Sequence, residues 1–338
     1  MNQQTAQIAV MGATGMVGKE ILEVLHTKGF NGKTIRIFAS ERSAGKTQQT
    51  PFGEKTIEHA DNINYSDFDI AFFAIGGSWP KENAPRAMNA GCTVIDNSSA
   101  FRYDDSVPLI IPEINPEDLG NSKLIANPNC TTAIAAIPLW HIHQHYGIVR
   151  AIFSTYQATS GAGNEGMSEL QKQTQNYLEG KEITHSAFVH PIPFNLIPHI
   201  DAFQENGYTR EEMKVVWEMR KIFHEPELPI SCTAVRIPTM RAHSESITLE
   251  TKKPVDVENI RKLLSSQEGI EVRDDIQNNI YPMPLTATHK YNVEVGRIRA
   301  NTVFGEHGID LFVSGDQVLR GAALNAVLIA ELVIAKRG

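Results

Sequence analysis

The sequence predicts an α/β protein of two domains: a doubly wound parallel sheet, followed by an α+β domain on a mostly antiparallel sheet. Before residue 130, the strands are apolar on both faces and alternate with helical or loop segments. After it, the strands alternate polar and apolar residues. The length of 338 residues also exceeds what one hydrophobic core usually serves. We therefore place the first domain at residues 1–130 and the second at 131–316.

The first domain opens with an apolar strand, a glycine turn and a helix over residues 7–29. Further strands follow, each with the composition of a fully buried parallel strand. They are predicted at residues 34–40, 69–77, 92–99 and 123–127.

The second domain mixes strands with helices. Strands are predicted at residues 148–161, 233–239, 244–251, 291–301 and 308–316, and helices at 131–147, 210–224 and 255–267. The last stretch, 317–338, predicts an amphipathic helix that packs back on the first domain and completes it.

The composition excludes several classes of protein. The net charge is −8 and no basic block occurs, which argues against nucleic acid as a partner. Neither a signal-peptide pattern nor an 18-residue apolar span is present, so we expect no membrane association. The three cysteines are widely spaced, unlike a disulfide framework, and a reducing cytoplasm fits them best.

Some possible ligands and thiols are interpreted as structural. His141, His143 and His145 lie at the end of a predicted helix with no carboxylate or cysteine beside them, so we expect no metal site. Cys92 and Cys232 lie in or near apolar strands and are expected to be buried.

Gly12, Gly15 and Gly18 form a G-x-x-G-x-x-G turn between a predicted strand and a predicted helix. Such glycines allow a tight turn and let backbone N–H groups at the helix start approach a pyrophosphate. Because the strand, the helix and the alternation that follows all fit, we predict a Rossmann-type dinucleotide site rather than a purely structural turn.

The type of dinucleotide depends on the end of the second strand. NAD sites usually place an acidic residue there, whereas arginine accommodates the 2′-phosphate of NADP. Ser40, Arg42 and Ser43 can donate to a phosphate. Lys46 adds positive charge, and Glu41 is the single acid. The balance favours NADP, and the alternative is a solvated polar loop.

Cys130 follows Asn-Pro-Asn and precedes a long helical run. A lone cysteine is by default a small buried hydrophobe. At a helix N-terminus, however, the dipole lowers the thiol pKa and raises the thiolate fraction. Beside a nicotinamide, such a thiolate suggests oxidation or reduction of a carbonyl through a thioester.

That chemistry needs a proton shuttle and groups that bind the substrate. His243, in the turn between two predicted strands, is the candidate shuttle. Arg236 lies on a strand, where its guanidinium could bind a carboxylate through two hydrogen bonds. Arg102 follows a strand end, near the edge where open α/β sheets bind ligands, and could hold a phosphate. Taken singly, each residue would more often be structural.

Six stretches together resemble one family. They are residues 12–18 (GATGMVG), 97–102 (NSSAFR), 127–132 (NPNCTT), 157–163 (QATSGAG), 211–214 (EEMK) and 235–244 (VRIPTMRAHS). In this order they resemble the bacterial aspartate-β-semialdehyde dehydrogenases, and the match runs from about residue 7 to the C-terminal GAALNAVLIAELV.

The resemblance implies catalytic roles. Cys130 would be the nucleophile that forms an acyl-enzyme, and His243 would be the acid/base. Arg236 would bind the substrate carboxylate, and Gln157 would orient the substrate at the thiol. Asn129, beside the cysteine, fits the oxyanion contacts of the family.

The resemblance also implies binding residues. Glu211 and Lys214 match an acidic residue and a lysine that contact the substrate amine and the phosphate, and Arg102 would contact the phosphate as well. On spacing alone, Glu211 and Lys214 would be a solvated ion pair on one helix face, and Glu212 is a second possible acidic member. The positions that would hold NADP are Thr14, Gly15, Met16, Val17, Ser160, Gly161 and Gln317, the last being asparagine in many relatives.

The function implied by the resemblance is the NADP-dependent, reversible conversion of L-aspartyl 4-phosphate to L-aspartate 4-semialdehyde by a cytoplasmic homodimer. The product would stand at the branch toward threonine, methionine and lysine, with diaminopimelate on the way to lysine. An N-acetyl-glutamyl-phosphate reductase is one alternative, but its blocked amine has no need for Glu211. A catalytically silent nucleotide-binding or redox-sensing protein is another, although it has no use for the cysteine, histidine and arginines in this order.

Overall fold

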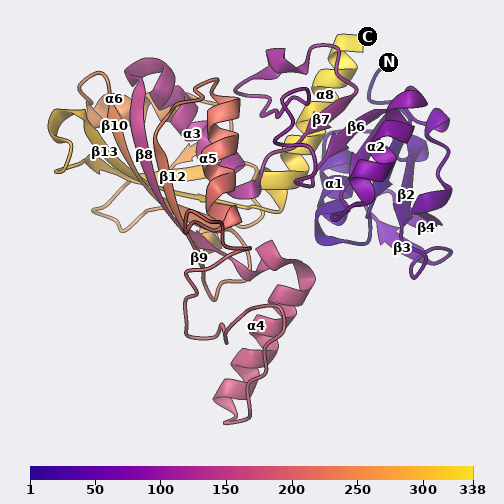
Figure 1. Ribbon diagram of the computed structural model, residues 1–338, viewed down its shortest axis with the longest axis horizontal. Coiled ribbons are helices and arrows are strands. Elements are labelled where there is room, and N and C mark those ends of the chain that lie inside the picture. Colours follow the sequence, from indigo (N-terminus) through magenta and orange to yellow (C-terminus); the bar gives the residue numbers. More distant parts are fainter. Residues whose placement is uncertain (338) are drawn as a thin grey trace. The chain divides into compact units, whose positions relative to one another are not determined.

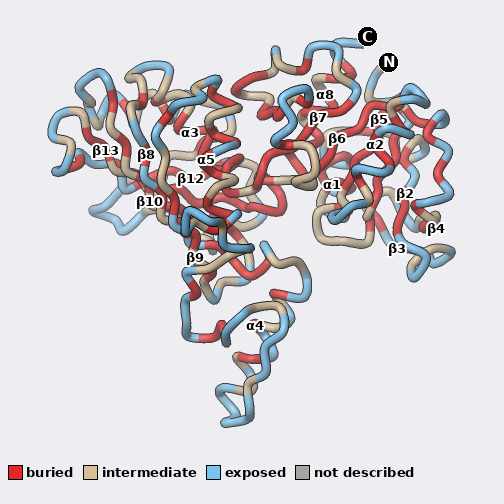
Figure 2. The backbone as a smooth tube through the Cα atoms, in the orientation of Figure 1, coloured by how far each residue is buried: buried red, intermediate tan, exposed pale blue. Residues whose placement is uncertain are grey.

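The computed structural model describes residues 1–337, so that Gly338, the end of the predicted C-terminal helix, lies outside the described residues. These residues form two compact units (Figure 1). The first unit comprises Met1–Asn129 together with the C-terminal stretch from Ala322, and the second comprises Cys130–Gly321. Each unit has its own buried core (Figure 2).

A seven-stranded sheet in the order β3-β4-β2-β1-β5-β6-β7 forms the core of the first unit. The predicted apolar strands are all present, as β1 (Ile8–Met11), β2 (Ile35–Ala39), β5 (Ile70–Phe73), β6 (Thr93–Asp96) and β7 (Leu124–Ala126). They pair in parallel. The strand order reverses at β1, which has β2 on one side and β5 on the other, and open α/β sheets bind ligands at such a switch point.

Two strands of this sheet were not predicted. β4 (Gly53–His59) pairs in parallel with β2, and β3 (Thr47–Thr50) pairs antiparallel with β4 at the sheet edge. Their side chains are mostly polar and partly exposed, so the apolar runs that indicate the central strands are missing here.

The helices of the first unit include α1 (Met16–Thr27), α2 (Trp79–Asn89) and α8 (Asn325–Arg337). α8 contacts α1 and β6, which confirms the prediction that the C-terminal helix packs back on the first domain. Two details of the prediction are wrong. The helix is α-helical only from Asn325, after a π-helical segment at Leu319–Leu324, and it is buried around most of its circumference rather than on one face.

A six-stranded sheet in the order β11-β12-β13-β10-β8-β9 forms the core of the second unit. Its strands are β8 (Ile148–Gln157), β9 (Ile230–Arg236), β10 (His243–Thr251), β11 (Ile270–Val272), β12 (Val293–Ala300) and β13 (Gly308–Gly315). The pairings around β10 and β13 are antiparallel, whereas β8 with β9 and β11 with β12 are parallel. All predicted strands are present, and only the three-residue β11 was missed.

One face of this sheet is covered by helices, and the other is open along β8. The covering helices include α3 (Cys130–Tyr146), α5 (Arg210–Ile222) and α6 (Val257–Ser265). The short α7 (Pro284–Ala287) lies on the other face, where its Thr286 donates to Glu294, which shares that face with Ser314. Along β8, inward residues such as Phe153 are buried, whereas outward Ile152 and Tyr156 are exposed. An unpredicted helix, α4 (Gly163–Leu178), projects from the unit together with the loops that follow it (Figure 1). No helix in the part of the chain that the structure describes is long and apolar enough to cross a membrane.

Candidate active site

Cys130 is the first residue of α3, which confirms the prediction of a thiol at a helix N-terminus. Its side chain is partly exposed, whereas Cys92 and Cys232 are buried. Burial raises the pKa of the Cys92 thiol to about 12 and holds that of Cys232 well above its ordinary value. Of the three thiols, only Cys130 combines access with the field of a helix end.

Gly321 packs directly against Cys130. A Cβ at position 321 would lie 2.9 Å from Cys130 Cβ and 3.0 Å from its carbonyl oxygen, so a larger residue would displace the backbone of Cys130. Sequence reasoning missed this residue, although a glycine inside an apolar helical run is a signal of close packing.

His243 is the first residue of β10 rather than part of a turn, and it is fully buried. Its Nδ1 accepts a hydrogen bond from the Ala158 N–H at 3.0 Å, so the neutral ring carries its proton on Nε2. Nε2 is buried and has no hydrogen-bond partner among residues 1–337. Burial, with a smaller effect of Arg236, lowers the pKa of His243 to about 3, so the ring is neutral at pH 7 without substrate.

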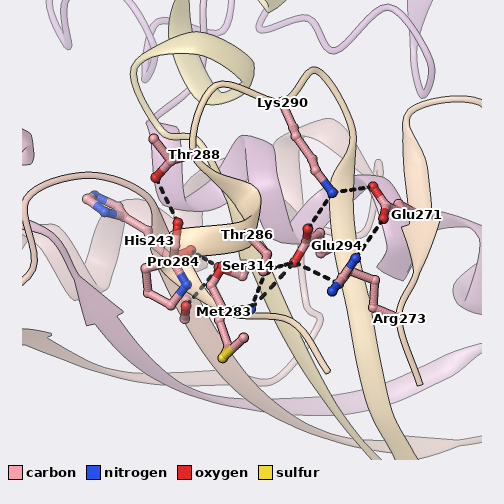
Figure 3. A network of polar contacts seen from close by, with 11 residues as sticks. His243, Glu271, Arg273, Met283, Pro284, Thr286, Thr288, Lys290, Glu294 and Ser314 are labelled. Atoms are coloured by element: carbon pink, nitrogen blue, oxygen red, sulfur yellow. Dashed lines mark hydrogen bonds and ion pairs between the residues drawn. The ribbon is translucent and has the colours of Figure 1, made fainter. Parts of the chain in front are cut away.

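A polar network supports the strand that begins at His243 (Figure 3). Ser314 Oγ donates to the His243 carbonyl oxygen at 3.3 Å. Beyond it, the buried carboxylate of Glu294 accepts from Lys290 at 2.8 Å and from Thr286 at 2.5 Å. The His243 ring points away from this cluster.

Arg236 is the last residue of β9 and is 6% exposed. Its Nη1 donates to the Ala158 carbonyl oxygen at 2.5 Å, and its guanidinium lies 5.9 Å from the Phe188 ring centre. Burial lowers the pKa of Arg236, while the charges of Glu211 and Cys130 oppose this shift, so both groups lie within electrostatic reach.

Gly161 brings Arg236 and His243 together. A Cβ on Gly161 would lie 2.6 Å from Arg236 Nη1 and 3.3 and 3.4 Å from Cε1 and Nε2 of His243. Since no side chain fits here, the Gly161 backbone lies directly against the Arg236 guanidinium and against His243 Nε2, which has no hydrogen-bond partner among the described residues.

Gln157, at the end of β8, joins this group through Glu211 of α5. Its Nε2 donates to Glu211 Oε1 at 3.1 Å, and Thr155 Oγ1 donates to its Oε1 at 2.9 Å. Lys214 Nζ lies 2.9 Å from Glu211 Oε2 and 2.8 Å from Oδ2 of Asp201.

The Glu211–Lys214 pair is buried. The side chains are only 8% and 13% exposed, so the expectation of a solvated ion pair is wrong. Sequence reasoning also missed Asp201 as a partner of Lys214, because it lies outside every motif.

Glu212, the second possible acidic residue, has a structural role. It forms a capping box with Thr209 at the start of α5, and its Oε1 accepts from the Ala234 N–H at 2.9 Å. The acidic side chain that faces Gln157 is therefore Glu211.

The glycine turn of the first unit has the geometry that a pyrophosphate needs. Gly12 has φ +78°, and a Cβ there would lie 2.4 Å from the Ala74 carbonyl oxygen. A Cβ on Gly18 would lie 2.3 Å from the Gly12 carbonyl oxygen, so α1 packs closely on β1. Gly15 is the N-cap of α1 and offers no side-chain cap, which leaves the first-turn N–H groups, including those of Met16 and Val17, open to an anion.

The remaining candidates fall into three places. The loop after β2 exposes Ser40, Glu41, Arg42 and Lys46, with Ser43 partly buried. In the same unit, Thr14 is partly exposed, Asn129 is buried, and Arg102 is buried with Nη2 donating to the Asn97 carbonyl oxygen at 2.9 Å. In the second unit, Gln317 Nε2 donates to Ser160 Oγ, and Gln317 Oε1 accepts from the Ala242 N–H at 2.8 Å. The structure thus brings Ser160 and Gln317 together.

The chain matches two families of protein domains. Residues 7–122 match the family "Semialdehyde dehydrogenase, NAD binding domain", and residues 139–320 match "Semialdehyde dehydrogenase, dimerisation domain". The aspartate-semialdehyde dehydrogenase of Aquifex aeolicus is 46% identical over 97% of this chain and 98% of its own length. That of Bacillus subtilis is 43% identical over 96% of each chain.

Solved structures lead to the same family. The crystal structure of aspartate semialdehyde dehydrogenase II from Vibrio cholerae, complexed with ASA, has a TM-score of 0.95 and 40% identity over 99% of this chain and 100% of that one. The enzyme from Candida albicans, solved with NADP, has a TM-score of 0.76 and 25% identity over 98% of this chain and 99% of that one. This chain therefore belongs to the aspartate-semialdehyde dehydrogenase family, oxidoreductases of amino-acid biosynthesis.

Proposed function

We propose that the chain converts L-aspartyl 4-phosphate to L-aspartate 4-semialdehyde, reversibly and with NADP, through a thioester on Cys130. The observation that carries the proposal is the convergence of Gln157, Glu211, Arg236 and His243 within one unit, with Cys130 in electrostatic reach of Arg236. One acid, one guanidinium and one imidazole match the three polar features of this substrate: its ammonium, its carboxylate and its reacting carbonyl.

Substrate recognition would divide between Arg236 and Glu211. The guanidinium of Arg236 can bind the α-carboxylate through two parallel hydrogen bonds. The buried carboxylate of Glu211 supplies the counter-charge that a free ammonium requires, and this favours the aspartyl substrate over an N-acetylated one. For the phosphate we propose Lys214, and on the sequence resemblance alone Arg102.

The covalent step would use the Cys130 thiolate. Its sulfur attacks the acyl carbon of aspartyl phosphate, the bond to the phosphate oxygen breaks, and inorganic phosphate leaves. Backbone N–H groups at the start of α3, around Asn129 to Thr131, would stabilise the oxyanion. Gln157, held by Thr155 and Glu211, would orient the acyl group.

His243 would act as the acid/base. The proton on Nε2 can donate to the oxygen that becomes negative when the thioester is reduced. Full protonation of the ring is disfavoured first by burial and then by the charge of Arg236. When the substrate carboxylate neutralises Arg236, that second effect weakens, so substrate binding would itself raise the pKa of His243.

When bound, NADPH would supply the hydride in the biosynthetic direction, and NADP would accept it in the reverse direction. The first-turn N–H groups of α1 behind Gly15 would hold its pyrophosphate. Ser40, Arg42 and Ser43 would hold its 2′-phosphate. On the sequence resemblance, Ser160, Gly161 and Gln317 would also contact NADP.

We also propose that the second unit forms a homodimer through the open face of its sheet. Ile152 and Tyr156 are 45% and 37% exposed on β8, a strand between two others, and the Tyr156 ring lies 6.0 Å from that of Phe312. A second copy of the chain suits this apolar face because the family match there is a dimerisation domain. Tyr156→Glu should give monomers by light scattering, and a retained dimer would assign the interface elsewhere.

One assay tests the activity. NADP reduction is followed with aspartate semialdehyde and phosphate, and in parallel with N-acetylglutamate semialdehyde and phosphate. We expect phosphate-dependent turnover with the first substrate only. Turnover with the acetylated substrate alone would overturn the proposed substrate. If NAD were reduced faster than NADP, the proposed cofactor would be wrong.

A further inference from the structure

We infer that Asp201 is a positioning residue: it stays paired with Lys214 while Glu211 turns from Lys214 to the ammonium group of the substrate. The inference rests on the proposed function, in which Glu211 binds that ammonium. It adds a second carboxylate whose task is to balance the lysine rather than to touch the substrate.

The geometry is that of one ammonium between two carboxylates. Lys214 Nζ lies 2.8 Å from Asp201 Oδ2 and 2.9 Å from Glu211 Oε2. The Lys214 side chain is only 13% exposed, so water cannot replace a lost partner fully. Glu211 is 8% exposed and bonded to Gln157, whereas Asp201 is 35% exposed. The inner carboxylate therefore faces the proposed site, and the outer one faces solvent.

The backbone at Asp201 is held in an unusual conformation. Its φ of +68° is left-handed, which few residues other than glycine adopt, and its Oδ1 accepts from the Ala202 N–H at 2.8 Å. Such conformations persist where the surroundings require them. Asparagine tolerates this region as well as aspartate does, so Asp201→Asn removes the charge and keeps the backbone preference.

The charges explain why two carboxylates are needed. Burial lowers the pKa of Lys214, and Glu211 and Asp201 together more than offset this effect, so its pKa stands above the ordinary value. If Glu211 were the only carboxylate partner, its move to the substrate would leave the buried ammonium of Lys214 without a counter-charge until phosphate binds. With Asp201 present, one carboxylate stays with Lys214 and the other is released.

The test measures selectivity for the amine. Succinate semialdehyde differs from aspartate semialdehyde only by lacking the amino group. For Asp201→Asn we expect the ratio of kcat/KM for aspartate semialdehyde over succinate semialdehyde to fall about tenfold, the effect of roughly one charge-assisted hydrogen bond. The KM for phosphate should not rise, because a negative charge has been removed.

A matched control separates this role from general support of the projecting segment. Glu169 of α4 accepts hydrogen bonds from the N–H groups of Ser186 and Ala187 at 2.8 and 2.7 Å and has no contact with Lys214. Glu169→Gln should leave the amine selectivity unchanged. Asp201→Glu, which restores a carboxylate, should recover most of the selectivity.

The outcomes are distinguishable. Equal losses with both aldehydes in Asp201→Asn, or the same loss of selectivity in Glu169→Gln, would overturn the inference. Glu211→Gln tests the proposed function itself: if that variant keeps the amine selectivity, the assignment of Glu211 fails. If Glu211→Gln loses the selectivity and Asp201→Asn retains it, only the inference about Asp201 fails.

Discussion

Replacing Gly161 with alanine should impair catalysis far more than folding. The added Cβ would lie 2.6 Å from Arg236 Nη1. Carbon contacts become favourable near 3.5 Å, so the guanidinium would have to move by roughly 1 Å. It has little room to do so, because Arg236 is 6% exposed and its Nη1 already donates to the Ala158 carbonyl oxygen. The His243 ring, at 3.3–3.4 Å from the new methyl group, would also have to move.

The expected size of the effect follows from this shift. Misplacing a substrate-orienting group by about 1 Å can lower catalysis by about 100-fold, which corresponds to roughly 2.7 kcal/mol. Overpacking a filled region lowers stability by about 1–3 kcal/mol. We therefore expect kcat/KM for aspartate semialdehyde to fall by about 100-fold in Gly161→Ala while the protein remains folded.

The assay combines steady-state kinetics with denaturant unfolding of two variants. Gly308→Ala is the matched control, because its Cβ would lie 2.8 Å from Asn301 Cβ and 2.9 Å from Phe304 Cβ, and neither residue belongs to the proposed site. It should lose similar stability and keep near-normal kinetics. Normal activity in Gly161→Ala, or parallel losses of activity in both variants, would refute the reasoning.

The thiol, the 2′-phosphate contact and the carboxylate contact can each be tested separately. Iodoacetamide at neutral pH should modify Cys130 and stop turnover, whereas burial raises the pKa values of Cys92 and Cys232 and so keeps both as unreactive thiols. If peptide mass spectrometry found Cys232 modified as fast as Cys130, this prediction would be contradicted. Cys130→Ala should remove turnover and keep NADP binding. Arg42→Ala should weaken NADP binding by about 1.5–3 kcal/mol in a titration and change NAD binding little, whereas equal losses would assign Arg42 to the fold or the pyrophosphate. Arg236→Lys should lower kcat and raise KM, and its kcat/KM should fall less for an analogue without the α-carboxylate. Equal losses of kcat/KM for both substrates would make Arg236 a structural residue.

Arg241, the other arginine near the candidate histidine, shows how the structure narrows such choices. In the sequence, Arg236 and Arg241 both stand close to His243 and carry the same charge. In the fold, Arg241 Nε lies 2.6 Å from the fully buried Oδ2 of Asp316, so its guanidinium serves a buried ion pair. Arg236 instead packs against Gly161, next to His243.

The sequence by itself determined the central strands, the glycine turn and the helix that starts at Cys130. These features depend on neighbouring residues: apolar runs, glycines at fixed spacing, and a thiol placed just before a helical run. The edge strand β3 and its neighbour β4 were not predicted because they carry no apolar run. The C-terminal helix was misjudged because its burial depends on what covers it.

Only the tertiary structure decided which of two adjacent glutamates faces Gln157, that Lys214 has Asp201 as a second partner, and that Gly161 and Gly321 must lack side chains. Each of these facts involves residues that are separated in the chain and meet only when it folds. Spacing along a helix shows that Glu211 and Lys214 share a face, but whether that face is solvated or buried depends on the burial and long-range contacts that folding creates.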